Sequence, residues 1–234
     1  MNIAIIPARG GSKRIPRKNI KSFHGKPIIA YSIEAAIQSG VFDRVIVSTD
    51  DSEIADIARE YGAETPFIRP QELSCDHTAT VPVIKHAIEE IESQTGQLIE
   101  SACCIYATAP FVVPDRIKMA YRILIEGNRD YCFPVVEFEY AIQRALAVDE
   151  VGSISMRESN QYHVRSQDLQ SYYHDVGQFY FGRKESWIQE KPVFLANSVV
   201  IKISKKYAQD IDTEADWEFA EYLYSYEINN NEKL

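Results

Sequence analysis

Two groups of charged residues, near opposite ends of the chain, have types and spacings that could carry chemistry. The first lies in IIPARGGSKRIPRKN, residues 5–19, where five Lys or Arg residues follow an apolar run. The second lies in QDIDTEAD, residues 209–216, where one residue separates Asp210 from Asp212. Clustered cations attract a multiply charged anion, and paired carboxylates attract a divalent cation. Together they indicate a polyphosphate ligand and its metal ion.

The N-terminal group combines charge with backbone freedom. Gly10 and Gly11 let the chain turn and approach an oxygen-rich ligand closely. Arg9, Lys13 and Lys18 can donate charge-assisted hydrogen bonds to phosphate. The stretch matches neither GxxxxGK[ST] nor GxGxxG, and the alternative is a solvated basic loop. The coincidence of five charges, two glycines and the end of an apolar strand favours phosphate binding.

The C-terminal group is a pair of carboxylates. On an extended segment, Asp210 and Asp212 lie on the same face, a spacing at which they repel unless a cation or a proton intervenes. Beside a triphosphate the expected cation is Mg²⁺, a hard ion that prefers oxygen ligands. Thr213 can cap the following helix, with Asp216 as its capping-box partner. The alternative is two solvated aspartates ahead of a helix.

The first stretch resembles the N-terminal signature of the sugar-activating cytidylyltransferases, which make CMP-linked nonulosonic acids such as CMP-sialic acid. The family also has a D-x-D-T-x-x-D segment, matched by residues 210–216, whose first two aspartates bind the metal. The resemblance implies catalytic roles for Lys18, Asp210 and Asp212, and Mg²⁺ as cofactor. It implies that a loop wraps the triphosphate of CTP through Ala8, Arg9, Gly10, Gly11, Ser12, Lys13, Lys18 and Asn19.

Two further stretches fall where the family contacts its substrates. In FIRPQELSCDHTAT (67–80), the resemblance places Arg69 at the cytosine end of CTP and Thr78 and Thr80 near the nucleotide, although a helix N-cap accounts for the threonines equally well. In YATAP (106–110), Tyr106 takes a position where sialic acid enzymes typically carry Gln, a sugar contact. That departure speaks against a sialic acid substrate.

The middle of the chain is similar to one branch of the family. The segments QRAL (143–146) and HDVGQFY (174–180) resemble the branch that acts on pseudaminic acid. By this resemblance the reaction transfers CMP from CTP to the anomeric hydroxyl of pseudaminic acid and releases pyrophosphate. The alternatives are the same reaction on N-acetylneuraminic or legionaminic acid, or a non-catalytic nucleotide-binding relative.

The same segments supply the expected sugar contacts. Arg144 and Arg165 suit the carboxylate of a sugar acid, because guanidinium binds carboxylate through two parallel hydrogen bonds. Gln143, Gln178 and Tyr180 are expected to bind sugar hydroxyl or acylamino groups. The aromatic residues around them could instead form a packed or dimer-facing cluster. His174 and Asp175 are not expected to act as a pair, since neighbours on a strand point to opposite faces.

Alternating strands and helices must position these residues. The pattern predicts an α/β, Rossmann-like, three-layer nucleotidyltransferase fold with a mostly parallel sheet, and ligands bind at the carboxyl ends of such strands. We expect one domain over 1–234, with an inserted arm at about 139–175 that dimerises the chain. Strands are expected at 2–7, 44–49, 63–68, 101–108, 130–138 and 176–182, with an extended stretch at 193–204. Helices are expected at 26–39, 51–62, 78–93, 114–127, 184–190 and within 210–227.

Composition narrows the class of protein. The 234 residues carry a net charge of −9, yet residues 1–33 hold seven Lys or Arg and no Asp or Glu. An acidic remainder argues against nucleic-acid or membrane binding and leaves a local anion site. No apolar run approaches the roughly 18 residues that span a bilayer, and no signal-peptide pattern begins the chain. We therefore expect a cytoplasmic homodimer that binds CTP and a nine-carbon sugar acid.

Overall fold

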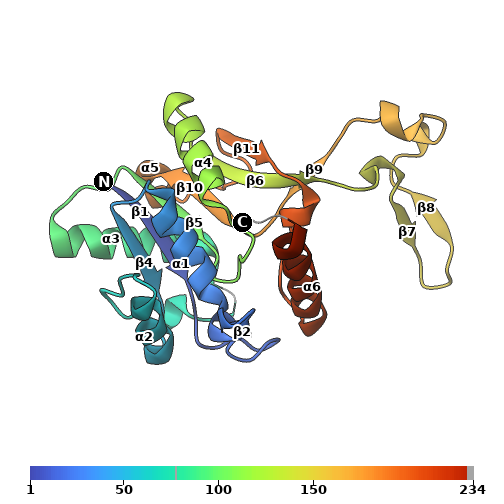
Figure 1. Ribbon diagram of the computed structural model, residues 1–234. Helices are drawn as coiled ribbons and strands as arrows, with labels where there is room; N and C mark the ends of the chain where they lie inside the picture. The colour runs from blue at the N-terminus through green and yellow to red at the C-terminus, as the bar shows by residue number, and fades with distance from the viewer. Residues whose placement is uncertain (77, 231–234) are drawn as a thin grey trace.

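A mixed sheet forms the centre of the protein. The computed structural model describes residues 1–76 and 78–230, and within them a seven-stranded sheet has the order β11-β6-β10-β5-β1-β4, with β9 paired to β6 (Figure 1). The strands are β1 (Asn2–Pro7), β4 (Arg44–Ser48), β5 (Ser101–Ile105), β6 (Tyr131–Glu137), β9 (Tyr173–Asp175), β10 (Phe179–Arg183) and β11 (Ser198–Lys202). Short pairs β2 (Ser22–Phe23) with β3 (Lys26–Pro27), and β7 (Leu146–Val148) with β8 (Ile154–Met156), lie outside it.

The sheet is mostly parallel, as predicted. Strand β1 is parallel to β4 and β5, and β11 is parallel to β6. Strand β10 is antiparallel to both β5 and β6, and β9 is antiparallel to β6. Only β9 and β10 therefore oppose the other strands of this described sheet. The α/β class is confirmed.

Helices cover both faces of the sheet and complete three layers (Figure 1). On one face, apolar residues of α1, α2 and α4 join those of the strands, and on the other face those of α3 and α5 do so. Helix α6 packs with α1 in a third cluster around Phe23 and Trp217. The helices are α1 (Ile28–Ser39), α2 (Ser52–Glu60), α3 (Thr80–Thr95), α4 (Pro114–Glu126), α5 (Lys184–Ile188) and α6 (Glu214–Asn230).

Local sequence signals account for several helix ends. Asp51 accepts a hydrogen bond from the Ile54 N–H at the start of α2, and Pro114 occupies the first turn of α4, where its missing N–H costs nothing. At α6, Thr213 and Asp216 exchange the reciprocal bonds of a capping box, with Asp216 N to Thr213 Oγ1 at 3.2 Å and Thr213 N to Asp216 Oδ2 at 2.8 Å.

Some predicted boundaries were wrong. The expected strand at 63–68 reduces to a single bridge between Glu64 and Ile46, because Pro66 cannot donate to a ladder. Helix α1 begins at Ile28, after Pro27 at its N-cap. Helix α3 begins at Thr80, and its N-cap is Ala79, with no side-chain cap. The alternative role of Thr78 or Thr80 as the N-cap is therefore excluded.

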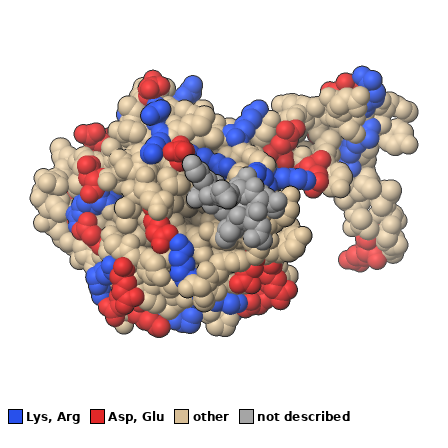
Figure 2. Space-filling model, viewed as in Figure 1, with Lys and Arg blue, Asp and Glu red and all other residues tan. Residues whose placement is uncertain are grey.

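Residues 138–172 form an arm that leaves β6 and returns at β9. Figure 1 shows the arm standing clear of the sheet and helices, with the β7–β8 hairpin at its far end, and the space-filling view of Figure 2 shows the same separation. Several of its apolar side chains are exposed, among them Tyr140, Val151 and Tyr162. Short 3₁₀ turns occur in the arm and elsewhere: η1 (Lys18–Ile20), η2 (Gln71–Leu73), η3 (Ile142–Arg144), η4 (Ser159–Gln161), η5 (Ser166–Asp168) and η6 (Lys205–Tyr207).

Within residues 1–76 and 78–230, no helix is long and apolar enough to cross a membrane.

Candidate functional site

A cavity of about 450 Å³ opens beside the carboxyl ends of β1 and β5. It is the place where the two charged groups of the sequence meet, since the loop after β1 and the segment before α6 both line it. This is the edge at which ligands bind in open α/β sheets. The predicted site residues that line it are Arg9, Ser12, Lys18, Asn19, Arg69, Thr78, Thr80, Tyr106 and Asp212.

The loop after β1 is held by backbone-directed bonds. Ala8 is buried and donates its N–H to Ser48 O at 2.9 Å, and Asn19 Nδ2 donates to Arg9 O at 2.9 Å. A Cβ on Gly10 would lie 2.6 Å from Asp51 Oδ2, whereas one on Gly11 would meet nothing within 4 Å. Packing against Asp51 therefore requires a glycine at position 10, a reason that differs from the predicted approach to a ligand.

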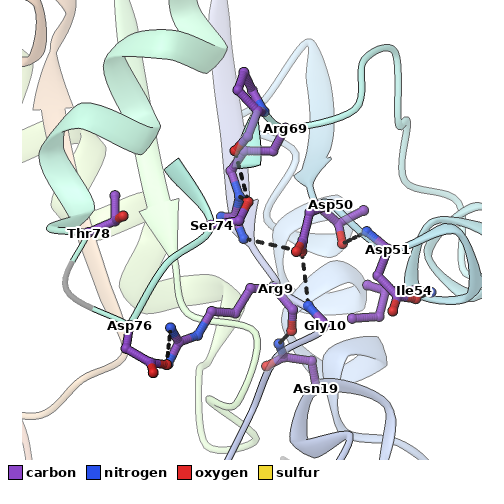
Figure 3. A network of polar contacts seen from close by, with 12 residues as sticks. Arg9, Gly10, Asn19, Asp50, Asp51, Ile54, Arg69, Ser74, Asp76 and Thr78 are labelled. Carbon is purple, nitrogen blue, oxygen red and sulfur yellow. Dashed lines mark hydrogen bonds and ion pairs between the residues drawn. The ribbon is translucent and has the colours of Figure 1, made fainter. Parts of the chain in front are cut away.

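A single acid pairs with two of the loop cations. Asp76 Oδ1 lies 2.7 Å from Arg9 Nη1 (Figure 3), and Asp76 Oδ2 pairs with Lys13 Nζ. The Lys13 ammonium, with Arg9 contributing, holds the pKa of the Asp76 carboxyl below its ordinary value. The repulsion that the sequence predicts among these cations is thus partly relieved within the protein. Lys13 itself does not line the cavity.

The acidic pair lies against the same loop. Asp212 Oδ1 is 2.8 Å from Arg14 Nη2 and 3.5 Å from Lys18 Nζ. The Lys18 ammonium also donates to Ile211 O at 2.6 Å. Asp210 keeps contact with solvent, yet partial burial and the neighbouring charge of Asp212 raise its pKa.

The pair fits a hard divalent cation only with help from a substrate. In the part of the chain that the structure describes, no group of three or more His, Cys, Asp or Glu could hold a metal ion. Asp210 forms no ion pair with a described residue, and burial, followed by the negative charge of Asp212, raises the pKa of its carboxyl. Two carboxylates with phosphate oxygens and waters form a donor set that Mg²⁺ accepts.

Two tyrosines pack together beyond β5, and one of them, Tyr106, lines the cavity. Tyr106 hydroxyl lies 3.0 Å from Thr80 Oγ1, and the Tyr106 and Tyr180 rings meet edge to face at 5.9 Å. Tyr180 is buried and donates to Asp175 Oδ2 at 2.5 Å. Burial raises the pKa of both phenols, which therefore stay protonated.

Two of the remaining predictions concern polar groups near these tyrosines. Gln178 is buried and donates through Nε2 to Tyr207 O, while its Oε1 has no hydrogen-bond partner among the described residues. His174 Nδ1 bonds the Asp175 carbonyl oxygen and not its carboxylate, so the two side chains do not act as a pair. Gln178 and Tyr180 do not line the cavity described above.

The structure does not bring the predicted contacts of the arm to the cavity of the same chain (Figure 1). Gln143 is buried and donates to Gln170 O at 2.8 Å. Arg144 Nη2 donates to Val164 O at 2.5 Å, and Arg165 Nε donates to Asp168 Oδ2 at 2.7 Å. All three side chains therefore bond within the arm itself.

The sequence patterns did not point to two acids at the site. Asp50 accepts a hydrogen bond from the Gly10 N–H at 2.9 Å, and Asp175 receives the Tyr180 hydroxyl. Asp50 follows β4 at the carboxyl edge of the sheet, and that position is the signal that could have identified it. Asp175 ends β9, which is antiparallel to β6, so the same rule does not point to it.

Comparison with known proteins agrees with the fold. The family described as Cytidylyltransferase matches residues 3–232. A pseudaminic acid cytidylyltransferase of Campylobacter jejuni is 48% identical over 223 residues, covering 95% of this chain and 96% of the relative. A CMP-N,N'-diacetyllegionaminic acid synthase of Legionella pneumophila is 31% identical, covering 94% of this chain and 95% of the relative.

A solved structure supports the fold independently. The structure of CMP:2-keto-3-deoxy-manno-octonic acid synthetase complexed with CTP has a TM-score of 0.72 at 18% identity, covering 97% of this chain and 99% of that chain. Identity this low bears on the fold alone. The family match over nearly all residues, and the similarity to relatives over nearly their whole length, lead to one conclusion: the chain belongs to the cytidylyltransferase family.

Proposed function

We propose that the protein transfers CMP from CTP to pseudaminic acid, giving CMP-pseudaminic acid and pyrophosphate. The observation that carries this proposal is the meeting of the cationic loop and Asp212 in one cavity at the sheet edge. The substrate follows from the Campylobacter jejuni relative, whose similarity extends over nearly the whole of both chains. The need for CTP favours a cytoplasmic location.

The proposed reaction is an in-line displacement without a covalent enzyme intermediate. The anomeric oxygen of the sugar forms a bond to the α-phosphorus, and the bond from that phosphorus to pyrophosphate breaks. Catalysis then consists of positioning and charge stabilisation. Arg9, Lys13 and Lys18 would stabilise the leaving pyrophosphate, once the triphosphate replaces Asp76 as the partner of Arg9 and Lys13.

Asp210 and Asp212 would hold Mg²⁺. When bound, the ion lowers the pKa of the attacking hydroxyl and offsets charge on the α-phosphoryl group. Arg14 and Lys18, which pair with Asp212, would turn to phosphate as the carboxylate turns to the metal. The nucleoside end would lie toward Arg69, with Ser12, Asn19, Thr78 and Thr80 along the wall between them.

The sugar would occupy the side of the cavity near Tyr106, with Gln178 and Tyr180 behind it. Its carboxylate needs a cation, and Arg144 and Arg165 bond only within their own arm. We propose that residues 1–234 form one domain and that two chains form a homodimer in which the arm, with Gln143, reaches the partner's site. The exposed apolar side chains of the arm support this assignment.

Two other functions remain as rivals. The Legionella pneumophila relative favours a legionaminic acid substrate as the second choice, with N-acetylneuraminic acid as the third. A non-catalytic nucleotide-binding protein is the rival from another class. The Asp210–Asp212 pair speaks against it, since a protein that only binds nucleotide does not need two carboxylates beside the phosphates.

A panel of sugar acids tests the proposal. Pyrophosphate release from CTP would be measured with pseudaminic, legionaminic and N-acetylneuraminic acids, with Mg²⁺ and with a chelator. We expect the highest kcat/KM with pseudaminic acid and no release with the chelator. Faster pyrophosphate release with another acid would identify that acid as the substrate. CTP binding without pyrophosphate release on any acid would support the non-catalytic rival.

A further inference from the structure

Asp50 stands between two walls of the nucleotide cavity. It follows β4 at the carboxyl edge of the sheet, and Figure 3 shows its carboxylate directed toward the Gly10 N–H on one side and the Arg69 guanidinium on the other. We propose that Asp50 is a positioning residue that holds the phosphate-binding loop and Arg69 in fixed relation. The inference rests on the proposed function, which gives these two walls to the triphosphate and to the nucleoside.

The link to the loop is a direct hydrogen bond. Gly10 N donates to Asp50 Oδ1 at 2.9 Å, and the preceding backbone bond from Ala8 N to Ser48 O ties the same loop to β4. Asp51 packs against the Gly10 backbone, because its Oδ2 would lie 2.6 Å from any Cβ on Gly10. The course of the loop therefore depends on Asp50 and Asp51, which follow β4.

The link to Arg69 is electrostatic. Arg69 Nη2 lies 3.8 Å from Asp50 Oδ1, and its side chain is 3% exposed. Its Nε donates to Ser74 Oγ at 3.1 Å, and its backbone N–H donates to Thr49 O at 2.8 Å. The residue before Asp50 thus fixes the backbone of Arg69, while Asp50 faces its charge.

A buried guanidinium requires a counter-charge. Burial, and to a smaller degree the nearby cation Arg9, lower the pKa of Arg69, whereas the charge of Asp50 opposes both. In residues 1–76 and 78–230, Asp50 is the one carboxylate within 4.0 Å of the Arg69 guanidinium. Removing its charge would leave a buried cation without compensation, a costly arrangement that the protein can relieve only by moving Arg69.

Asp50 acts through its neighbours and not as a ligand. Its side chain is absent from the described lining of the cavity, to which Arg9 and Arg69 both belong. A carboxylate in contact with a triphosphate would also repel it. The two contacts of Asp50 can be separated chemically: asparagine keeps an oxygen for the Gly10 N–H but loses the charge that faces Arg69, whereas alanine loses both.

The test compares Asp50→Asn and Asp50→Ala with a matched control. Asp43 lies before the opposite end of β4 and accepts the Asn2 N–H through Oδ2 at 2.7 Å, so Asp43→Asn alters a similar contact far from the cavity. Dissociation constants for CTP, cytidine and tripolyphosphate would be measured by calorimetry, together with kcat and KM for CTP.

We expect Asp50→Asn to weaken cytidine and CTP binding about tenfold, the scale of one lost charged contact, with tripolyphosphate changed less than about twofold. Asp50→Ala should weaken all three. KM for CTP should rise in both variants while kcat falls less than about threefold. Asp43→Asn should match the unaltered protein in every measurement.

The outcomes separate this inference from the proposed function. If the unaltered protein binds and turns over CTP and the Asp50 variants do the same with unchanged constants, the role of Asp50 is refuted and the function stands. If CTP binds with these effects but no sugar acid is converted, the role of Asp50 stands and the function fails. An unaltered protein that binds none of the three probes would overturn both. A lower melting temperature with unchanged constants would reduce Asp50 to a structural residue and also overturn the inference.

Discussion

The N-terminal loop and the arm both carry basic residues predicted to bind substrate, and they differ in where those residues find their partners. In the loop, Arg9 pairs with Asp76, Arg14 with Asp212 and Arg17 with Asp51, so each cation joins segments far apart in the sequence. In the arm, Arg165 pairs with an acid three residues away. These loop cations cross-link the fold, whereas the arm cations Arg144 and Arg165 bond only within the arm.

This difference indicates that one chain can assemble the half of the site formed by the loop cations, but not the half proposed for the arm. Long-range ion pairs fix the loop cations around the cavity whatever the arm does. The arm keeps its internal bonds but has few contacts that would direct Arg144 or Arg165 toward a cavity. We therefore expect changes near the cavity to act within one chain and changes on the arm to act across a dimer.

The largest effect should come from Asp212→Asn. Loss of one carboxylate from the proposed Mg²⁺ pair should lower kcat at least about a thousandfold, since the metal would stabilise charge at the reacting phosphorus. The fold should persist, because Arg14 and Lys18 lie near solvent on the cavity wall. Single-turnover assays and circular dichroism would measure both. Glu214→Gln, which alters the nearby ion pair with Lys21, is the control, and near-normal turnover in Asp212→Asn would refute the metal assignment.

The next effect concerns the arm. Arg144→Ala should raise KM for the sugar acid by about 10- to 100-fold, as expected for a lost guanidinium–carboxylate contact, and should leave the CTP dissociation constant unchanged. Arg157→Ala, an exposed arginine on the same arm, should behave as the unaltered protein. A change in CTP affinity with Arg144→Ala would contradict the separation between the two regions.

Mixing the two impaired proteins, and assaying the mixture at a sugar concentration far below the KM of Arg144→Ala, tests whether the arm acts across a dimer. When Asp212→Asn and Arg144→Ala chains exchange subunits at random, half of the dimers are mixed and each of these has one site with both residues intact. The mixture should then regain about a quarter of full activity in a symmetric dimer. No recovery of activity, or a fully active monomer in sedimentation, would mean that Asp212 and Arg144 of one chain serve the same site. The proposed difference between the loop and the arm would then be wrong.

The contrast also explains how much could be predicted from sequence. Elements with a clear period and end signals, such as the buried strand Asn2–Pro7 and the Pro114 helix, were predicted closely. The predicted strand at 63–68 failed because Pro66 cannot donate to a ladder, and Ile68 is exposed to solvent. In the arm, no period specifies the path of residues 139–175, and only the presence of an inserted arm was predicted.

At the site, family motifs led to the residues lining the cavity, but not to their partners. Asp76 pairs with Arg9 and Lys13, and Asp50 with Gly10 and Arg69, through contacts between distant segments that no local pattern encodes. The distance of Arg144 from the cavity of its own chain is likewise a property of the folded arm. Residue types predict the chemistry, whereas the pairing that tunes it requires the tertiary structure.

A smaller effect should appear in the pH dependence of stability. The hydrogen bond from Arg17 lowers the pKa of Asp51, so this carboxylate stabilises the fold above its unfolded-state pKa of about 3.9 and loses that contribution as the pH falls through the folded value. Asparagine keeps the helix cap but not the charge. We expect Asp51→Asn to cost about 1 kcal/mol of unfolding free energy at pH 7, allowing for the partial exposure of Arg17.

Urea unfolding of both proteins between pH 3 and pH 7 measures this prediction. The difference should stay constant above about pH 5 and shrink below about pH 4, where the unaltered carboxylate takes up its proton. Asp56→Asn removes a local pair with Arg59 on the same helix and should cost almost nothing. If Asp51→Asn and Asp56→Asn lower the free energy of unfolding equally, long-range and local ion pairs would contribute equally to the stability of this protein.

The smallest effect should be a gain in binding. Asp76 lies close to Arg9 and Lys13, where it competes with the phosphates for both cations. Asp76→Asn should therefore tighten CTP and tripolyphosphate binding by roughly two- to fivefold, because exposed ion pairs are weak and screened by salt. The gain should be constant above about pH 5, since Lys13 and Arg9 lower the pKa of Asp76 and keep it ionised there.

Calorimetry at two salt concentrations measures this gain, with Asp168→Asn on the arm as the control. Asp168 pairs with Arg165 within the arm, so its removal should leave CTP affinity unchanged in an isolated chain. Weaker CTP binding by Asp76→Asn would mean that Asp76 organises the loop for the nucleotide and does not compete with it. The loop cations would then depend on Asp76 as Arg69 is proposed to depend on Asp50, and the cavity would be built from cross-links on both of its walls.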